Sequence, residues 1–226
     1  MTDQVAALEA RIAQLENRLT RAEDVEAIRR LQYTYGYYLD KTYYEEVVEL
    51  FADGEDTRVH FLHGVFHGKE GAKRLYTGRF MTKFAEGHNG PRYGRLLDHP
   101  QMQGIITLSE DGQSARARFR SVMQAGTHET VPGFRQWFEG GLYENEYVKQ
   151  DGQWRIKVLN MRSFWQGDFD KGWSRAPVEY AGYLTETYPT DPHGPDEIVD
   201  DWSMFPHTET MPFHYVHPVT GRQVTD

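Results

Sequence analysis

The sequence predicts an α+β domain in which helices cover one face of an antiparallel sheet. Apolar residues recur at helical spacing through the first part of the 226-residue chain, whereas residues 95–165 are rich in strand-forming segments. Two Asp-Gly hairpin signals, Asp111-Gly112 and Asp151-Gly152, separate those strands. Because helices and strands fall in separate runs, the expected fold class is α+β.

The first expected element is a helix with a short heptad pattern. Its seam residues alternate at spacings of three and four: Val5, Leu8, Ile12, Leu15, Leu19 and Ala22. Such a seam is typical of a coiled coil, so residues 1–22 are predicted to be a helical oligomerisation arm. The alternative is a helix that folds back on its own domain. The next helix is expected to begin at residues 22–24.

A cluster of six tyrosines surrounds one acid, Asp40, within residues 31–44. The apolar spacing predicts an amphipathic helix with its tyrosines turned toward the interior. A carboxylate is rarely buried unless a partner pairs with it, so Asp40 is either a turn residue in water or part of a polar site. We favour the polar site, because Gly36 one turn earlier would leave open space beside the carboxylate.

The remaining elements follow from local periodicity and turn signals. Helices are expected at 44–51 and 69–84, two short strands at 57–66, and long strands at 95–108, 114–124, 136–148 and 154–165. After residue 167 the pattern gives way to prolines and aromatic residues. Residues 168–226 are therefore expected to form an irregular arm on the domain or on a neighbouring subunit, with a short helix in 177–187 and structural histidines at His207, His214 and His217.

Composition excludes several classes of function. The absence of cysteine removes disulfides and thiolate nucleophiles, and a net charge of −9 without a basic stripe argues against a nucleic-acid partner. No apolar run reaches membrane-spanning length and no signal peptide is visible, so we expect a cytoplasmic protein without a membrane partner. Nucleotide-binding and serine-hydrolase motifs are also missing. The 14% aromatic content is compatible with a pocket for an aromatic ligand.

Residues 28–51, followed by hairpin-bounded strands that end in Asp-Gly-Gln-Trp-Arg-Ile, resemble the SnoaL-like branch of the nuclear transport factor 2 superfamily. The resemblance covers residues 23–167. It implies a cone-shaped domain, in which a curved antiparallel sheet wraps three helices around a pocket. Some members bind proteins and many are cofactor-free enzymes. Tyr35, Asp40 and a strand histidine are similar to the branch that holds scytalone dehydratase, bile-acid dehydratase and hexachlorocyclohexane dehydrochlorinase.

Carried over by position, this resemblance implies a catalytic set of four residues. Asp40 would orient His99, which would remove a proton while a leaving group departs; Tyr35 and Arg162 would assist. Pro100 directly after His99 cannot donate a ladder hydrogen bond, so His99 is expected on a bulge or an edge and not within a regular strand.

Further side chains are candidates for holding the substrate. Val59, Phe61 and His63 are expected to point inward from one strand, with His60 on the surface. A metal shared by His60, His63 and His67 is disfavoured because odd spacing sends the first two to opposite faces. The complete substrate-binding set is Tyr37, Tyr44, Phe61, His63, Trp137, Asn160 and Trp165, and no metal or cofactor is expected.

The predicted function is a cofactor-independent lyase that acts on a phenolic alcohol by general acid-base chemistry. A narrower resemblance, to sphingomonad diarylpropane lyases, implies a lignin-derived diaryl diol as substrate and a stilbene and formaldehyde as products. The alternatives are a non-catalytic binding or assembly module, and an isomerase or hydrolase that uses the same pocket. The expected partners are a small aromatic substrate and further copies of the chain, as a dimer or trimer.

Overall fold

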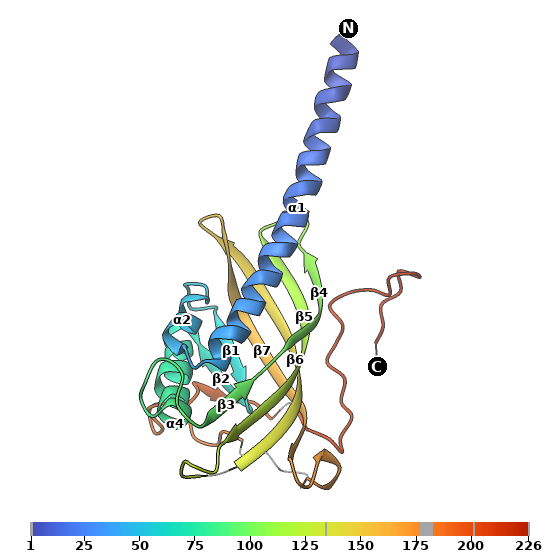
Figure 1. The fold of residues 1–226 in the computed structure, drawn as a ribbon. Helices are drawn as coiled ribbons and strands as arrows, with labels where there is room; N and C mark the ends of the chain where they lie inside the picture. The colour runs from blue at the N-terminus through green and yellow to red at the C-terminus, as the bar shows by residue number, and fades with distance from the viewer. Residues whose placement is uncertain (1, 134, 177–182, 201, 226) are drawn as a thin grey trace.

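The computed structural model describes residues 2–133, 135–176, 183–200 and 202–225, and it confirms the α+β class. A strongly curved open sheet holds the helices against one face, and a long N-terminal helix projects beyond the sheet (Figure 1). We call the face of the sheet toward the helices the inner face. The opposite face, on which residues 202–214 of the C-terminal segment pack, is the outer face.

The N-terminal helix α1 runs without a break from Thr2 to Asp40. The expected second helix start at residues 22–24 is wrong. Asp24 does not cap a helix; its carboxylate accepts hydrogen bonds from Trp154 Nε1 and Lys149 Nζ, each at 2.7 Å. The Asp24 carboxylate, which suggested a helix start, is therefore bonded by Trp154 and Lys149 from distant strands. No glycine or proline interrupts the helix at this point.

The first turns of α1 do not contact the rest of the domain. The seam residues Val5 to Leu19 are 52–61% exposed. Figure 1 shows this part of the helix extending away from the sheet. A helix folded back on its own domain is therefore wrong for this chain.

A short 3-10 helix, η2 (Trp173–Arg175), follows β7. Four other helical segments cover the inner face of the sheet beside the second half of α1. They are α2 (Tyr44–Glu49), α3 (Gly68–Lys73), the π-helical segment η1 (Arg74–Phe80) and α4 (Met81–Ala85). The last three form one continuous stretch, as predicted for residues 69–84. They bury large side chains at Leu75, Tyr76 and Phe80, which together with Tyr44 build much of the core.

The sheet has the order β3-β5-β6-β7-β1-β2-β8, with β4 also paired to β5. Its strands are β1 (Arg58–Phe61), β2 (Gly64–His67), β3 (Arg95–Asp98), β4 (Gln101–Leu108), β5 (Ser114–Thr127), β6 (Arg135–Gln150), β7 (Gln153–Asp168) and β8 (Glu197–Ile198). One pair, β1 with β7, is parallel, so the sheet is mixed and not purely antiparallel. The chain leaving α2 already runs alongside β7 in that direction, as the parallel Phe51–Ile156 bridge shows.

The strand predicted at 95–108 is divided into two. β3 pairs with the end of β5 and β4 with its beginning, and His99-Pro100 lies in the gap. Proline has no N–H to donate, so the ladder is interrupted there. This confirms that His99 lies at an irregular position of an edge strand.

The C-terminal segment packs on its own domain. Arg118 Nη2 donates to the carbonyls of Met211 and Pro212, at 3.0 and 2.7 Å. Arg118 and His214 both pair with Glu144 on the outer face of the sheet, which confirms His214 as a structural residue. Residues 177–182 of the expected short helix lie outside the described residues, and 183–187 are not helical.

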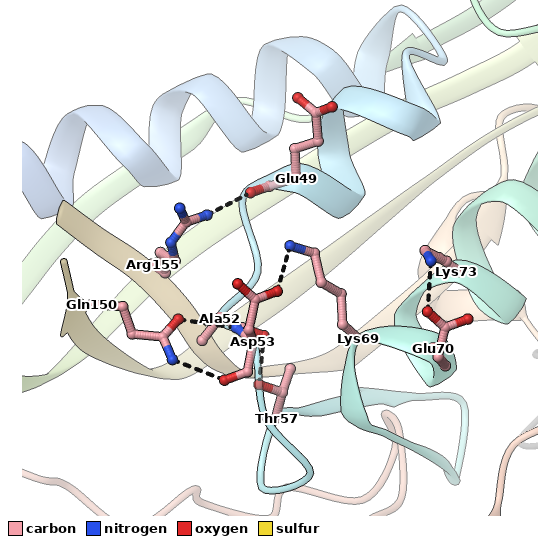
Figure 2. A network of polar contacts seen from close by, with 9 residues as sticks. All are labelled: Glu49, Ala52, Asp53, Thr57, Lys69, Glu70, Lys73, Gln150 and Arg155. Carbon is pink, nitrogen blue, oxygen red and sulfur yellow. Dashed lines mark hydrogen bonds and ion pairs between the residues drawn. The ribbon is translucent and has the colours of Figure 1, made fainter.

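A polar network ties the loop after α2 to the β6–β7 hairpin (Figure 2). Gln150 exchanges two hydrogen bonds with the backbone of Asp53, at 3.0 and 2.8 Å. Lys69 Nζ lies 2.9 Å from the Asp53 carboxylate, and Arg155 donates to the carbonyl of Glu49 at 3.2 Å. These contacts fix the loop after α2 against the end of the β6–β7 hairpin.

Candidate active site

A cavity of about 360 Å³ lies between the helices and the inner face of the sheet. This volume is at the lower end of the range for small-molecule sites, about 300–1,000 Å³. Aromatic and aliphatic side chains form most of its wall. A few polar groups converge on it, and the ones used below are Tyr35, His99, Glu139, Tyr143 and Ser163.

The polar centre of the cavity is a histidine–aspartate pair. His99 Nδ1 lies 2.7 Å from Asp40 Oδ1, and the His99 backbone N–H donates to the same oxygen at 2.8 Å. A carboxylate acceptor places the proton of neutral imidazole on Nδ1 and leaves Nε2 as the basic nitrogen. His99 is 8% exposed and lines the cavity, with Asp40 behind it.

The position of this pair follows from two local features. Asp40 is the last residue of α1, directly before the turn at residues 41–42. Residue pairing between β3 and β5 stops at Asp98, so the His99 N–H is not used in the ladder and can bond the carboxylate. Because the strand is interrupted here, the backbone N–H of His99 bonds to Asp40 and fixes the position of the histidine.

Amide side chains hold the histidine from its other side. Gln101 Nε2 donates to the His99 carbonyl at 2.9 Å, and Gln32 Nε2 donates to Gln101 Oε1 at 2.7 Å. A Cβ on Gly36 would lie 2.7 Å from Gln101 Cγ. The space at Gly36 is therefore occupied by Gln101, and the expected opening beside the Asp40 carboxylate is wrong.

Buried phenols form a second part of the cavity wall. The hydroxyls of Tyr35 and Tyr76 are 2.9 Å apart, and the ring of Tyr143 lies 6.0 Å from that of Tyr35. Burial raises the pKa of each of these three phenols above its ordinary value. They are neutral at physiological pH and can donate hydrogen bonds to an oxygen of a ligand.

Tyr44 adds a phenol whose hydroxyl has no hydrogen-bond partner within the described part of the chain. The residue is fully buried and lines the cavity, and burial raises its pKa. A buried polar atom without a partner is costly. A ligand oxygen could supply the missing partner.

Glu139 on β6 is a buried acid of the cavity that the sequence analysis missed. It is 7% exposed, Ser163 Oγ donates to its Oε1 at 3.4 Å, and Gln166 Nε2 donates to its Oε2 at 2.5 Å. Burial raises the pKa of Glu139, while His99 and the two donors oppose the shift. Strand alternation could have revealed it, because residue 139 shares a face with the predicted pocket residue Trp137.

Several predicted site residues do meet at this cavity. Tyr35, Tyr44, Phe61, His99 and Trp137 all line it.

The prediction for Asn160 and Arg162 is wrong by one residue. Both lie on the outer face of β7, beside a groove under the C-terminal segment. The cavity is lined instead by Leu159, Met161 and Ser163, which alternate with them. Because side chains of a strand alternate, a shift of one residue moves the entire set to the other face.

Trp165 also lies on the outer face, against the rings of Phe138 and Trp173 at centroid distances of 5.4 and 6.4 Å. The irregularity at Gly140/Gly141 in the β6–β7 pairing changes the alternation, so Gln166 lines the cavity. This bulge was not visible in the sequence pattern.

Two further candidates lie outside the cavity. Tyr37 is 75% exposed, because inward positions Tyr35 and Leu39 place residue 37 on the opposite side of α1. His63 lies in the turn after β1 and contacts the C-terminal segment, with Nε2 2.7 Å from the Trp202 carbonyl oxygen. His60, expected at the surface, lines the cavity instead.

A search of the described residues for metal-binding groups finds no cluster of three or more histidine, cysteine or acidic side chains. None of the described helices combines the length and apolar character needed to cross a bilayer.

Comparison with known proteins places the chain in a family. The SnoaL-like domain matches residues 20–160, and the chain belongs to this family, within the nuclear transport factor 2-like superfamily. No match is found among curated proteins.

Solved structures share the fold at low sequence identity. A scytalone dehydratase-like protein from Novosphingobium aromaticivorans DSM 12444 is 24% identical, with a TM-score of 0.53, and the match covers 66% of this chain and 90% of that one. Hexachlorocyclohexane dehydrochlorinase LinA-type3 from Novosphingobium barchaimii LL02 is 17% identical, with a TM-score of 0.55 and coverage of 71% and 99%. These matches confirm the curved-sheet fold and leave the activity to be argued from the site.

Proposed function

We propose that the chain is a cofactor-independent lyase that acts on a phenolic alcohol by general acid-base chemistry. The observation that carries the proposal is the His99–Asp40 pair, 2.7 Å apart, at the wall of a cavity that also holds a buried acid and neutral phenols. Dehydration and dehydrochlorination, named for two proteins of this fold, both pair removal of a proton with loss of a leaving group. The substrate class follows from the aromatic wall, since aromatic side chains pack well against aromatic rings.

The best specific substrate is a diaryl diol with a free phenol, converted to a stilbene. In the first step His99 Nε2 takes the phenolic proton, and protonated Glu139 gives its proton to the benzylic hydroxyl. The carbon–oxygen bond breaks, water leaves and a quinone methide forms. Asp40 stabilises the resulting imidazolium.

In the second step the primary hydroxyl returns a proton to Glu139 while its carbon–carbon bond breaks. Formaldehyde leaves, the electron pair of that bond restores the aromatic ring, and the phenolate regains its proton from His99. One diol gives one stilbene, one formaldehyde and one water, and both protein groups return to their starting states. In this proposal Tyr35 and Tyr143, which line the cavity, donate hydrogen bonds to developing negative charge.

The test is turnover of a phenolic diaryl diol by purified protein, followed by stilbene absorbance and by free formaldehyde. Replacement of His99 by glutamine is expected to lower kcat by about 10²- to 10⁴-fold, the usual contribution of a positioned general base. His128→Gln is the matched control, because His128 is an exposed histidine that does not line the cavity.

Two results would contradict the proposal. Wild-type protein that binds phenolic diols without releasing either product would favour the non-catalytic binding module. Products formed equally well by the His99→Gln variant would remove the histidine from the chemistry.

A further inference from the structure

The N-terminal arm, which we define as residues 2–22 of α1, is a helix without a packing partner in the described chain. Five large apolar side chains along it are more than half exposed: Val5, Leu8, Ile12, Leu15 and Leu19. Most helical stability in proteins comes from packing of an apolar face. A stripe of this kind on a projecting helix therefore needs a partner (Figure 1).

The seam has the composition of a two-stranded parallel coiled coil. In heptad notation, Val5, Ile12 and Leu19 occupy a positions, and Leu8, Leu15 and Ala22 occupy d positions, so the first two heptads pair a β-branched residue at a with leucine at d. β-Branched residues at a combined with leucine at d favour two parallel strands over three or four. The apolar pattern therefore favours a second helix of the same kind.

The charges beside the seam select the orientation of that second helix. The e positions hold Glu9, Glu16 and Glu23, and the g positions hold Arg11 and Arg18. All five are exposed. In a parallel pair each g residue faces the e residue of the following heptad on the other helix, which brings arginine to glutamate.

An antiparallel pair would place g beside g and e beside e. Arginines would then face arginines and glutamates would face glutamates, which is unfavourable. The five charges therefore favour a parallel pair of helices and disfavour an antiparallel pair.

We infer that the N-terminal arm pairs in parallel and in register with the arm of a second copy of this chain. The pairs Arg11–Glu16 and Arg18–Glu23 form between the two copies, in both directions. Because α1 continues without a break from the arm to Asp40, the two catalytic domains lie at the same end of the paired helices. This inference does not depend on the proposed reaction.

Single-cysteine variants of the full chain test both the pairing and its direction, because the natural chain has no cysteine. Leu8→Cys places a thiol in the seam, where two copies meet only if the helices are parallel and in register. Ala10→Cys is the matched control, since residue 10 is an exposed f position on the far side of the helix. After mild oxidation at micromolar protein, Leu8→Cys is expected to form a disulfide-linked dimer and Ala10→Cys to remain largely monomeric on a non-reducing gel.

Charge reversal provides the second test, made in the Leu8→Cys background. A chain with Glu9, Glu16 and Glu23 changed to arginine, and a chain with Arg11 and Arg18 changed to glutamate, are each expected to lose the cross-link. Mixing the two is expected to restore it as a mixed dimer, because every facing pair is then of opposite charge.

The inference is overturned if the two cysteine variants cross-link to the same extent or if neither does. It is also overturned if the charge-reversed chains still cross-link alone, or if the wild-type chain sediments as a monomer or a trimer at micromolar concentration. None of these outcomes depends on whether the diol is a substrate.

Discussion

The two faces of strands β6 and β7 differ in how their polar side chains are used. On the inner face, Glu139 and Ser163 point into a largely apolar cavity beside a histidine–aspartate pair. On the outer face, Glu144 pairs with Arg118 and His214 and helps to fix the C-terminal segment. Neighbouring residues of the same strands therefore differ in what they contact: one set lines the cavity, and the other holds the C-terminal segment.

The two acids, Glu144 and Glu139, differ in their partners and in their surroundings. The outer acid is satisfied by two basic side chains, whereas the inner acid has a raised pKa because of burial. The hydroxyl of Tyr44 has no partner in the described part of the chain. The inner acid is therefore held by neutral donors, Ser163 and Gln166, whereas the outer acid is held by basic side chains.

The largest expected effect is on the inner side. Asp40→Asn keeps the shape of the residue but removes the charge that holds the His99 proton on Nδ1. We expect kcat for the diol to fall by about 10²-fold or more with little change in KM, because substrate binding does not need the charge. Asp56→Asn is the control, since Asp56 is an exposed partner of Lys157. An effect on KM alone would show that Asp40 shapes the cavity without orienting a base.

The next effect tests the outer face. Glu144→Gln leaves the buried Arg118 guanidinium without its counter-charge, and we expect the free energy of unfolding to fall by about 3 kcal/mol. Glu146→Gln on the same strand removes an exposed pair with Arg116 and should cost about 1 kcal/mol or less. Urea unfolding measures both variants, and limited proteolysis reports release of residues 202–225. Loss of turnover in the folded Glu144→Gln protein would contradict the division between the faces.

A smaller effect concerns pH. The folded state holds the Glu139 proton more tightly than the unfolded chain does, since burial raises its pKa above the ordinary 4.5. The contribution of the Glu139 carboxyl group to the free energy of unfolding is therefore complete below pH 4.5. It is lost as the pH rises through the pKa of Glu139 in the folded state. We expect Glu139→Gln to gain stability relative to wild type as the pH rises above 4.5, measured by urea unfolding.

Glu129→Gln serves as the exposed control for this experiment. A stability difference between wild type and Glu139→Gln that does not change with pH would show that the carboxyl group is not buried in solution.

The smallest effect is at Tyr44. Tyr44→Phe removes a buried hydroxyl without a partner in the described chain, so we expect the free energy of unfolding to change by about 0.5 kcal/mol or less, or to rise slightly. Weaker binding of the diol by this variant, seen as a higher KM, would show that the hydroxyl contacts the substrate. A large loss of stability would show that it has a partner in the folded protein.

Much of the fold could be predicted because its signals are local. Asp-Gly turns and period-two patterns defined β5, β6 and β7 to within a few residues, and Pro100 indicated the interruption beside His99. The His99–Asp40 contact joins residues 59 apart in sequence, and no spacing rule could predict it; the family resemblance did.

The failures have a common physical cause, which is that strand register depends on long-range pairing. The bulge in the β6–β7 pairing and the one-residue shift at Arg162 placed three predicted residues on the wrong face. Asp24 misled in another way, because a side chain that often caps a helix is satisfied here by Trp154 from a distant strand.

The brief strand β8 has a consequence for the behaviour of the protein at high concentration. It pairs with β2 at Gly64 and Val65, and the adjoining Asp196 N–H donates to the Val65 carbonyl at 2.9 Å. Without this cover, β2 would present a row of unpaired backbone groups on which another molecule could add a strand. Residues 196–199 therefore cover the edge of β2. A chain that ended before residue 196 would expose this edge, and we expect it to aggregate more readily.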